Sequence, residues 1–214
     1  QETFFITVVE INCPADLTVC QTDAEFELTG ATPAGGAFEG DGVTMVSSSY
    51  YFSPSTAGSG VHNISYYPNP LDRTHFCMFT ITVNPSPTVA NAGADQTGAS
   101  TCGLTSVTLA GNTPTVGTGS WSIVSGTGGS LGTASSPTST FTGTAGSTYV
   151  LRWTISNPPC TASSDEMTVT FNQSPTVANA GADQTGASTC GLTSVTLAGN
   201  TPTVGTGSWS IVSG

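Results

Sequence analysis

A long stretch of this chain occurs twice without a single change. Ser86–Gly126 reads SPTVANAGADQTGASTCGLTSVTLAGNTPTVGTGSWSIVSG, and the same letters return at Ser174–Gly214, 88 residues later. A fixed offset with full identity indicates a tandem array of one structural unit. The sequence therefore predicts one complete unit at 86–173, followed at 174–214 by the first half of an identical repeat domain.

The residues before the repeat have the layout of one further unit. FTITVNPSPTV (79–89) leads from one unit into the next, and FFITVVEINCP (4–14) has the same layout. We therefore expect a domain at 10–85, preceded at 1–9 by the closing strand of an earlier domain or by a donor strand. The candidate assembly residues in that strand are Phe4, Phe5, Ile6 and Val8. The alternative is a plain N-terminal arm and a disordered C-terminal tail.

Both units carry the signals of strands rather than helices. Gly, Pro, Ser and Thr interrupt every segment, and long runs with a period of 3.6 residues are missing. In the complete unit we expect strands at 106–111, 120–124, 138–142, 148–155 and 167–171, with Trp153 on the inward face of the fourth. The first unit repeats the scheme with EFELTG, YYFSP, HNISYY and MFTITV. Short strands at regular spacing predict an all-β fold of tandem antiparallel β-sandwich domains.

Charge and composition exclude several functions. Thirteen acidic residues stand against two arginines and no lysine, which gives a net charge of −11. Nucleic acid is excluded as a partner because a phosphate backbone requires clustered Lys and Arg. We also expect no membrane insertion in this segment, because it has no run of roughly 18 apolar residues.

The sequence shows no catalytic constellation, so we expect no enzyme activity and no cofactor. His62 and His75 are the only histidines, and neither accompanies a nucleophile motif. Asp95 and the pair Asp165–Glu166 lack the spacing of a calcium loop and are expected to be solvated. GTGG at 126–129 lacks the lysine of a phosphate loop and is expected to form a hairpin turn.

The six cysteines suggest one disulfide per domain in an oxidising, extracellular setting. Cys102 and Cys190 occupy the same position in the two copies, and Cys160 follows Cys102 by 58 residues. This spacing predicts a Cys102–Cys160 bond, and it makes Cys190 a candidate for a disulfide to the next repeat or to another chain. Zinc is the rival interpretation, but no CxxC occurs, so we expect no metal site. In the first domain three cysteines compete, and separation alone favours Cys20–Cys77.

The residues of the complete unit also resemble a known family. VTLAGNTPTVGTGSWSIVSG followed by PTSTFTGTAGSTYVLRWTISNPPC resembles the PKD-like, immunoglobulin-like repeats of large surface proteins of Bacteroidetes-type bacteria. The resemblance places Trp121, and with it Trp209 of the second copy, at the family's core tryptophan on strand C. The chain departs from the pattern where SWSIVSG replaces the usual acidic W-x-F-G-D-G stretch.

NCPADLTVC and CMFTITV in the first domain resemble the start and end of an HYR-type module, another immunoglobulin-like family. This resemblance implies a Cys13–Cys77 bond, with Cys20 as the alternative partner. The leftover thiol is then expected to be buried and inert, or to bond another chain.

These features predict a structural extracellular protein, a segment or subunit of a bacterial surface filament, stalk or adhesin. Its partners would be copies of itself, as a homopolymer, or neighbouring repeats of a longer chain. The alternative is a carbohydrate-binding or adhesive module, for which Tyr51 and Tyr67 are the candidate contacts with surface glycans. Asn63 and Asn172 match the N-glycosylation acceptor pattern.

Overall fold

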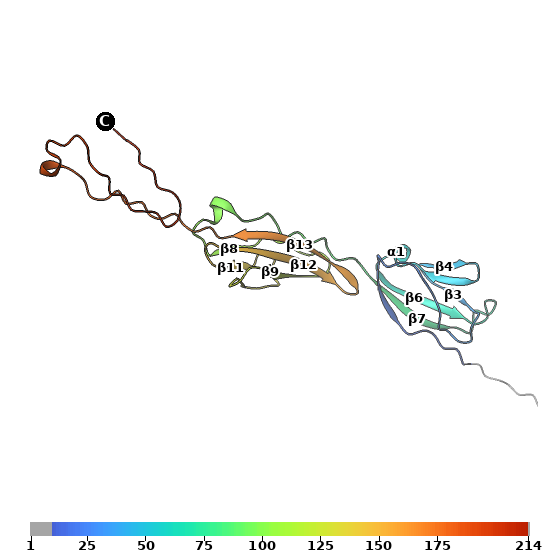
Figure 1. The fold of residues 1–214 in the computed structure, drawn as a ribbon. Helices are drawn as coiled ribbons and strands as arrows, with labels where there is room; N and C mark the ends of the chain where they lie inside the picture. Colours follow the sequence, from blue (N-terminus) through green and yellow to red (C-terminus); the bar gives the residue numbers. More distant parts are fainter. Residues whose placement is uncertain (1–9, 214) are drawn as a thin grey trace, which may run out of the picture.

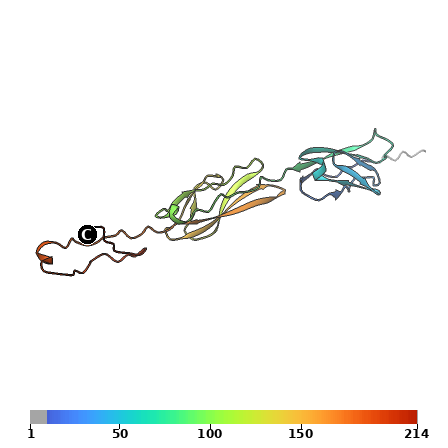
Figure 2. The ribbon, with the colours of Figure 1, turned by 90° about the horizontal axis from the view of Figure 1, so that it is seen from above.

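The computed structural model describes residues 10–213, so the candidate assembly residues Phe4, Phe5, Ile6 and Val8 lie outside the described part of the chain. The strands form two groups joined by an extended linker, and a segment without strands follows them (Figure 1). Seen from above, the three parts follow one another in a row (Figure 2). The described chain is therefore elongated, and each part contacts only its neighbours along the sequence.

The first sandwich packs a four-stranded sheet against a three-stranded sheet. Its elements are β1 (Leu17–Cys20), β2 (Phe26–Glu27), β3 (Ala37–Glu39), β4 (Val43–Val46), β5 (Ser49–Phe52), α1 (Pro54–Ala57), β6 (Gly60–Tyr67) and β7 (Cys77–Asn84). The sheets have the orders β1-β7-β6-β3 and β2-β5-β4. Side chains alternate along the long strands, so that Ile64 and Ile81 face the core and are fully buried.

The second sandwich packs two three-stranded sheets. Its elements are η1 (Gly98–Thr101), β8 (Ser106–Thr108), β9 (Thr118–Ser125), β10 (Ser130–Leu131), β11 (Thr140–Thr142), β12 (Thr148–Asn157) and β13 (Cys160–Thr170). The sheets have the orders β13-β12-β9 and β10-β11-β8. Trp121 and Trp153 lie opposite each other on β9 and β12 with ring centroids 5.1 Å apart, and both are buried as predicted.

The first and last segments of each sandwich run in the same direction. β1 pairs with β7 in parallel, with Leu17 opposite Ile81. In the second sandwich, Gln96 forms a parallel bridge to Val169 on β13. The chain therefore enters each sandwich at one end and leaves it at the other, which places successive units head to tail. The remaining strand pairs within the named sheets are antiparallel, and the predicted all-β fold of tandem immunoglobulin-like sandwiches is confirmed.

Some local details differ from the sequence-based expectation. The sequence did not indicate the short strands β1, β3 and β4, which have only three or four residues each. The GTGG stretch was expected to be a hairpin turn, but it joins β9 and β10, which belong to different sheets. Its glycines permit this passage: a Cβ on Gly129 would lie 2.7 Å from the ring of Phe141.

The second copy of the repeat has a different structure from the first. Within 174–213 the described elements comprise one 3₁₀ turn, η2 (Gly186–Thr189), and no strand. Trp209 is 55% exposed, whereas its counterpart Trp121 is 3% exposed. The prediction that Trp209 is a core residue is therefore wrong for this structure, because no β12 strand lies opposite it.

Candidate functional site: the junction between the sandwiches

A disulfide joins the two sandwiches across their junction. Cys20 at the end of β1 is bonded to Cys160 at the start of β13, with their Cα atoms 4.9 Å apart and a sequence separation of 140. Both residues are buried, at 1% and 7% exposure. The chain-entropy relation gives about 5 kcal/mol for closing a loop of this length in the unfolded chain. The bond therefore fixes how the two sandwiches meet.

Two asparagine side chains hold the linker on either side of this bond. The Nδ2 of Asn84, the last residue of β7, donates to the carbonyl oxygen of Pro158 at 2.7 Å. The Nδ2 of Asn157, the last residue of β12, donates in return to the carbonyl oxygen of Pro85 at 2.8 Å. An asparagine at the end of a strand in each sandwich thus donates a neutral hydrogen bond to a backbone carbonyl across the junction.

The backbone next to Cys20 is tied to the same linker. The amide of Gln21 donates to the carbonyl oxygen of Asn84 at 2.9 Å. The Sγ atom of Cys160 lies 3.4 Å from the carbonyl oxygens of Asn84 and Pro85. Because a disulfide sulfur carries no hydrogen, these are packing contacts, and they show how closely the hairpin turn of the second sandwich covers the linker.

Past the linker, the chain is anchored to the second sandwich at several points. The Oγ1 of Thr88 accepts hydrogen bonds from the amides of Thr115 and Val116, both at 2.9 Å. The amide of Ala90 donates to Ser163 Oγ at 2.9 Å. These contacts shorten the free part of the linker to the few residues around Ser86, which limits bending at the junction.

The predicted Cys102–Cys160 disulfide is wrong. Cys160 is bonded to Cys20, and Cys102 is a free, exposed thiol. The reason is the topology of the second sandwich. Cys160 lies in the β12–β13 turn at the end where the chain enters, whereas Cys102 lies at the opposite end, with its Sγ 3.6 Å from the carbonyl oxygen of Gln173. A spacing of 58 residues reports loop length and not which end of a sandwich each residue occupies.

The other disulfide of the first domain agrees with the resemblance to HYR modules. Cys13 is bonded to Cys77 with the Cα atoms 5.7 Å apart. The remaining thiol of that domain, Cys20, was expected to be buried and inert or to bond another chain, but it bonds the next sandwich of its own chain. The signal available in the sequence was the odd number of cysteines in 10–85 together with a cysteine in the NPPC turn.

The candidate glycan contacts lie in the first sandwich, away from the junction. Tyr67 is half-buried, and Arg73 covers its ring, with the guanidinium carbon 4.5 Å from the ring centroid. Arg73 also forms an ion pair with Glu39 at 2.7 Å. That face of the Tyr67 ring is therefore occupied by a side chain of the same domain. Tyr51 is half-buried on β5, opposite Glu27 and Thr44 on the neighbouring strands.

The two candidate glycosylation sites differ in environment. Asn63 is exposed on β6. Asn172 is half-buried, and its Nδ2 donates to the carbonyl oxygen of Gly98 at 2.8 Å. Because N-glycosylation modifies this nitrogen, a glycan on Asn172 would compete with that hydrogen bond.

The acidic candidates for calcium binding hold backbone amides instead. Asp95 Oδ1 accepts from the amide of Thr168, and Asp165 Oδ2 accepts from the amide of Ala92, both at 2.8 Å. Glu166 forms an exposed ion pair with Arg152. Among residues 10–213, no group of three or more His, Cys, Asp and Glu residues lies where it could hold a metal ion.

The clearest perturbed carboxyl group also has a local structural role. Thr74 donates both its amide and its hydroxyl to Asp72 Oδ1, at 2.9 and 2.6 Å. These bonds, together with the contact from His75, lower the pKa of Asp72 to about 2. The group lies in the exposed loop between β6 and β7, so its charge stabilises that loop and takes no part in the junction. The other histidine, His62, contacts the carbonyl oxygen of Gly58 through Nε2 at 2.9 Å.

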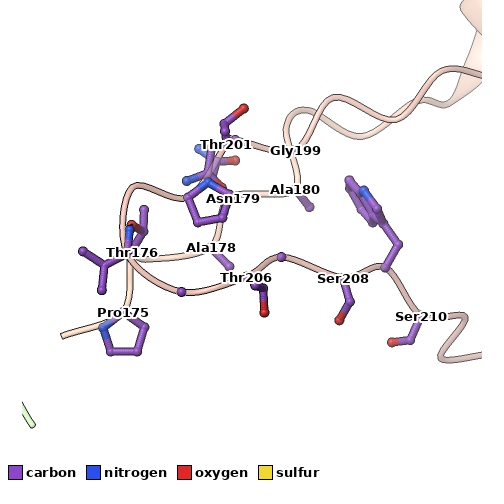
Figure 3. Close-up of a pocket in the computed structure, with 16 residues that line it drawn as sticks. Pro175, Thr176, Ala178, Asn179, Ala180, Gly199, Thr201, Thr206, Ser208 and Ser210 are labelled. Carbon is purple, nitrogen blue, oxygen red and sulfur yellow. Dashed lines mark hydrogen bonds between the residues drawn. The ribbon is translucent and has the colours of Figure 1, made fainter. Parts of the chain in front are cut away.

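The second copy of the repeat forms an open hollow. It is an open space of 630 Å³ between the segments that begin at Pro175 and at Gly199 (Figure 3). Figure 3 shows small side chains around it, such as those of Ala178 and Ser208, with no charged group among its lining residues. In the first copy the corresponding space is filled by the core of the sandwich. The hollow is open in the second copy because no later strands of the repeat pack over it.

No helix in the described residues is long and apolar enough to cross a membrane. No protein-family model matches the sequence, and no curated protein matches it either. Several solved structures of tandem domains are similar in shape. They include extracellular domains 3–5 of Drosophila OTK, at 8% identity and a TM-score of 0.40, covering 76% of this chain and 61% of that chain.

Three immunoglobulin domains of a titin variant are similar at 14% identity and a TM-score of 0.40, with 76% of this chain and 64% of that chain covered. Human CDH23 EC21-23 is similar at 9% identity and a TM-score of 0.40, with 79% and 70% covered. The chain thus spans about three fifths of the length of the first of these structures. At such low identity and TM-scores, these likenesses carry no argument about function.

Proposed function

We propose that this chain is a structural segment of an extracellular filament, stalk or adhesin, built from tandem immunoglobulin-like domains and acting as a stiff, tension-resistant spacer. Its neighbours are further repeats of the same protein or other copies of the chain. The division into domains at 10–85 and 86–173 remains part of the proposal. The proposal includes no catalytic role.

The Cys20–Cys160 disulfide is the observation that carries this proposal. A covalent bond between consecutive domains stabilises the folded chain and fixes how the sandwiches meet, and it also carries load when the chain is pulled. Tension applied at the two ends would pass from β1 through the disulfide directly into β13. The residues between Cys20 and Cys160 would then be shielded from extension.

The resemblance to PKD-like and HYR-like repeats supports a surface protein of a bacterium, and the disulfides support an oxidising location outside the cytoplasm. The head-to-tail arrangement of the sandwiches supports a linear array. Pairing of Phe4, Phe5, Ile6 and Val8 with a sheet edge of another copy stays a proposal that rests on the sequence alone. Deleting residues 1–9 and imaging assembly would test it, and unchanged assemblies would contradict it.

Stretching the full chain from its two ends in a single-molecule force experiment tests the load-bearing role. The disulfide hides about 140 residues, so we expect reduction to add roughly 480 Å of extended length, at about 3.4 Å per residue. In Cys20→Ser/Cys160→Ser without reductant, the Cys13–Cys77 bond still shields its own loop, so we expect about 76 residues or roughly 260 Å of added length. Reduction of that variant should release the remainder. Equal extension before and after reduction would show that the bond carries no load.

Immunogold electron microscopy of the producing cells, with an antibody against residues 86–173, tests the location. We expect label on fibres or on the outer surface of intact cells. Label confined to the cell interior would contradict the proposed function, whatever the mechanical result.

A further inference from the structure

The two linkers of this chain are equivalent, and only one of them is crossed by a disulfide. Asn84 and Pro85 precede the second sandwich, and Asn172 and Gln173 stand 88 residues later, before the second copy of the repeat. Cys20 and Cys160 close the first linker. At the second linker, Cys102 is free and exposed.

Cys102 occupies at the second linker the place that Cys20 occupies at the first. The residue after Cys20 donates its amide to the carbonyl oxygen of Asn84 at 2.9 Å. The residue after Cys102, Gly103, donates its amide to the carbonyl oxygen of Asn172 at 2.8 Å. Because the same backbone hydrogen bond is made to the same position of each linker, Cys20 and Cys102 occupy equivalent backbone positions relative to the two linkers.

The sulfur of Cys102 also points at the position where a partner sulfur is expected. In the first junction, Cys160 Sγ lies 3.4 Å from the carbonyl oxygen of Pro85. In the second, Cys102 Sγ lies 3.6 Å from the carbonyl oxygen of Gln173, which is the counterpart of Pro85. A hairpin turn like that of Asn157–Cys160, placed on the second linker as it is on the first, would therefore bring its cysteine against Cys102.

We propose that Cys102 is the attachment site for the cysteine that corresponds to Cys160 in a completed following repeat, so that every junction of the array is closed by a disulfide between neighbouring domains. The partner is a second copy of residues 127–173, continuing the repeat that begins at Ser174. By the same equivalence, Cys190 is left free for the repeat after that one.

Bond formation requires an oxidant, which we assign to a low-molecular-weight disulfide of the extracellular medium. The thiolate of one cysteine attacks this disulfide, forms a mixed disulfide and releases one small thiol. The thiolate of the second cysteine then attacks the mixed disulfide and releases the other small thiol. Two protein thiols become one protein disulfide, the oxidant is reduced to two thiols, and both protons of the protein thiols are accounted for.

The consequence for an array is that the closed loops overlap. The loop from Cys20 to Cys160 contains Cys102, so a bond from Cys102 to the next repeat begins inside the first loop and ends outside it. Each closed loop therefore overlaps the next one along the sequence. The side chain of Asn172, which now donates to the carbonyl oxygen of Gly98, would turn to the new hairpin as Asn84 does to Pro158.

The test uses the full chain extended after Gly214 by a copy of residues 127–173 and refolded in a glutathione buffer. Free thiols are alkylated under denaturing, non-reducing conditions and counted by intact mass. Because the Cys102 and Cys190 peptides are identical in sequence, peptide masses cannot separate them, and serine variants must do so. Cys102→Ser and Cys190→Ser form a matched pair, since both change the same position of the same repeat.

We expect one alkylated thiol in the extended chain, none in its Cys190→Ser variant and two in its Cys102→Ser variant. The opposite assignment, two in Cys190→Ser and none in Cys102→Ser, would mean that the bond forms within a domain and would overturn the proposal. Three alkylated thiols in the extended chain would overturn it as well. Inserting a whole copy of 86–173 between Gln173 and Ser174 provides a second chain with one more cysteine. Each count should then be one higher: two alkylated thiols in that chain, one when the cysteine of the inserted copy that corresponds to Cys102 is changed to serine, and three in its Cys102→Ser variant.

This inference rests on the proposed role only for the oxidising surroundings, and the two fail separately. The thiol counts can come out as expected in a protein that immunogold places inside the cell. Conversely, fibres labelled at the cell surface can contain Cys102 as a free thiol, which alkylation of the intact fibres would show.

Discussion

The two copies of the repeat have the same sequence and different structures. Their comparison separates the contacts that form within the repeated stretch from those that need the residues after it. Both copies keep the same short-range frame. The amide of Asn91 donates to Asn112 Oδ1 at 2.8 Å in the first copy, and the amide of Asn179 donates to Asn200 Oδ1 at 2.7 Å in the second. The 3₁₀ turns η1 and η2 also occupy equivalent positions.

The contacts that differ are those with residues 127–173. In the first copy, the amides of Leu109 and Trp121 donate to Ser139 and Ala134, both at 2.8 Å, and these acceptors follow the repeated stretch. The second copy has no such partners within the described chain, and Leu197 is 54% exposed where Leu109 is 1% exposed. Turns and side-chain bonds are therefore fixed locally, whereas β8 and β9 exist because β11 and β12 pair with them.

The largest expected difference between the copies is at their tryptophans. Trp121→Ala removes a ring packed against Trp153 and should destabilise the second sandwich by about 3–5 kcal/mol. Trp209→Ala, the matched control, should change the free energy of unfolding by less than about 0.5 kcal/mol. Denaturant unfolding of both variants measures the difference. Equal losses would show that the second copy is packed in solution.

The next largest effect concerns the two junctions rather than the two copies. Replacing Cys20 and Cys160 by serine should lower the free energy of unfolding by about 2–5 kcal/mol and let the sandwiches reorient. Small-angle scattering should then show a broader distance distribution than for the parent chain. Cys102→Ser is the control at the open junction, and it should leave both the stability and the scattering of this chain unchanged. A Cys20→Ser/Cys160→Ser profile identical to the parent's would show that the asparagine bonds alone hold the junction.

A smaller effect on stability is expected from the asparagine hydrogen bonds that both copies share. Asn112→Ala removes the hydrogen bonds to the amide of Asn91 and to the carbonyl oxygen of Val89, and it should cost about 1–2 kcal/mol. Asn200→Ala removes the same local bonds without a packed domain around them, so unfolding should not change. Hydrogen exchange should nevertheless show faster exchange of the Asn179 amide. Unchanged exchange in that variant would mean that the local frame of the second copy does not form in solution.

The same distinction explains how much could be predicted from the sequence. Alternation along residues 148–155 predicted that Trp153 lies on the inward face of its strand, and Trp153 is buried on β12. The inward face of a long strand can be predicted in this way because the alternation of apolar and polar side chains lies within the strand itself. The short strands β3 and β4 carry too few residues for any pattern. They form by pairing, β3 with the longer β6 and β4 with the neighbouring β5.

The junction could not be predicted in the same way. Pairing Cys20 with Cys160 requires knowing which ends of two sandwiches meet, and this depends on the direction in which the first and last segments of each one run. Sequence separation favoured bonds within a domain because it treats each domain as an isolated loop. The uneven cysteine count of the first domain was the one indication that a bond leaves it.

Disulfide mapping of the native, unextended chain tests the junction most directly. Thiols are blocked without reductant, the chain is cleaved with pepsin at low pH to prevent exchange, and linked peptides are identified by mass spectrometry. We expect a linked pair that contains Cys20 and Cys160, a second that contains Cys13 and Cys77, and two blocked thiols at Cys102 and Cys190. A linked pair that contains Cys102 and Cys160, with Cys20 blocked, would contradict the covalent junction.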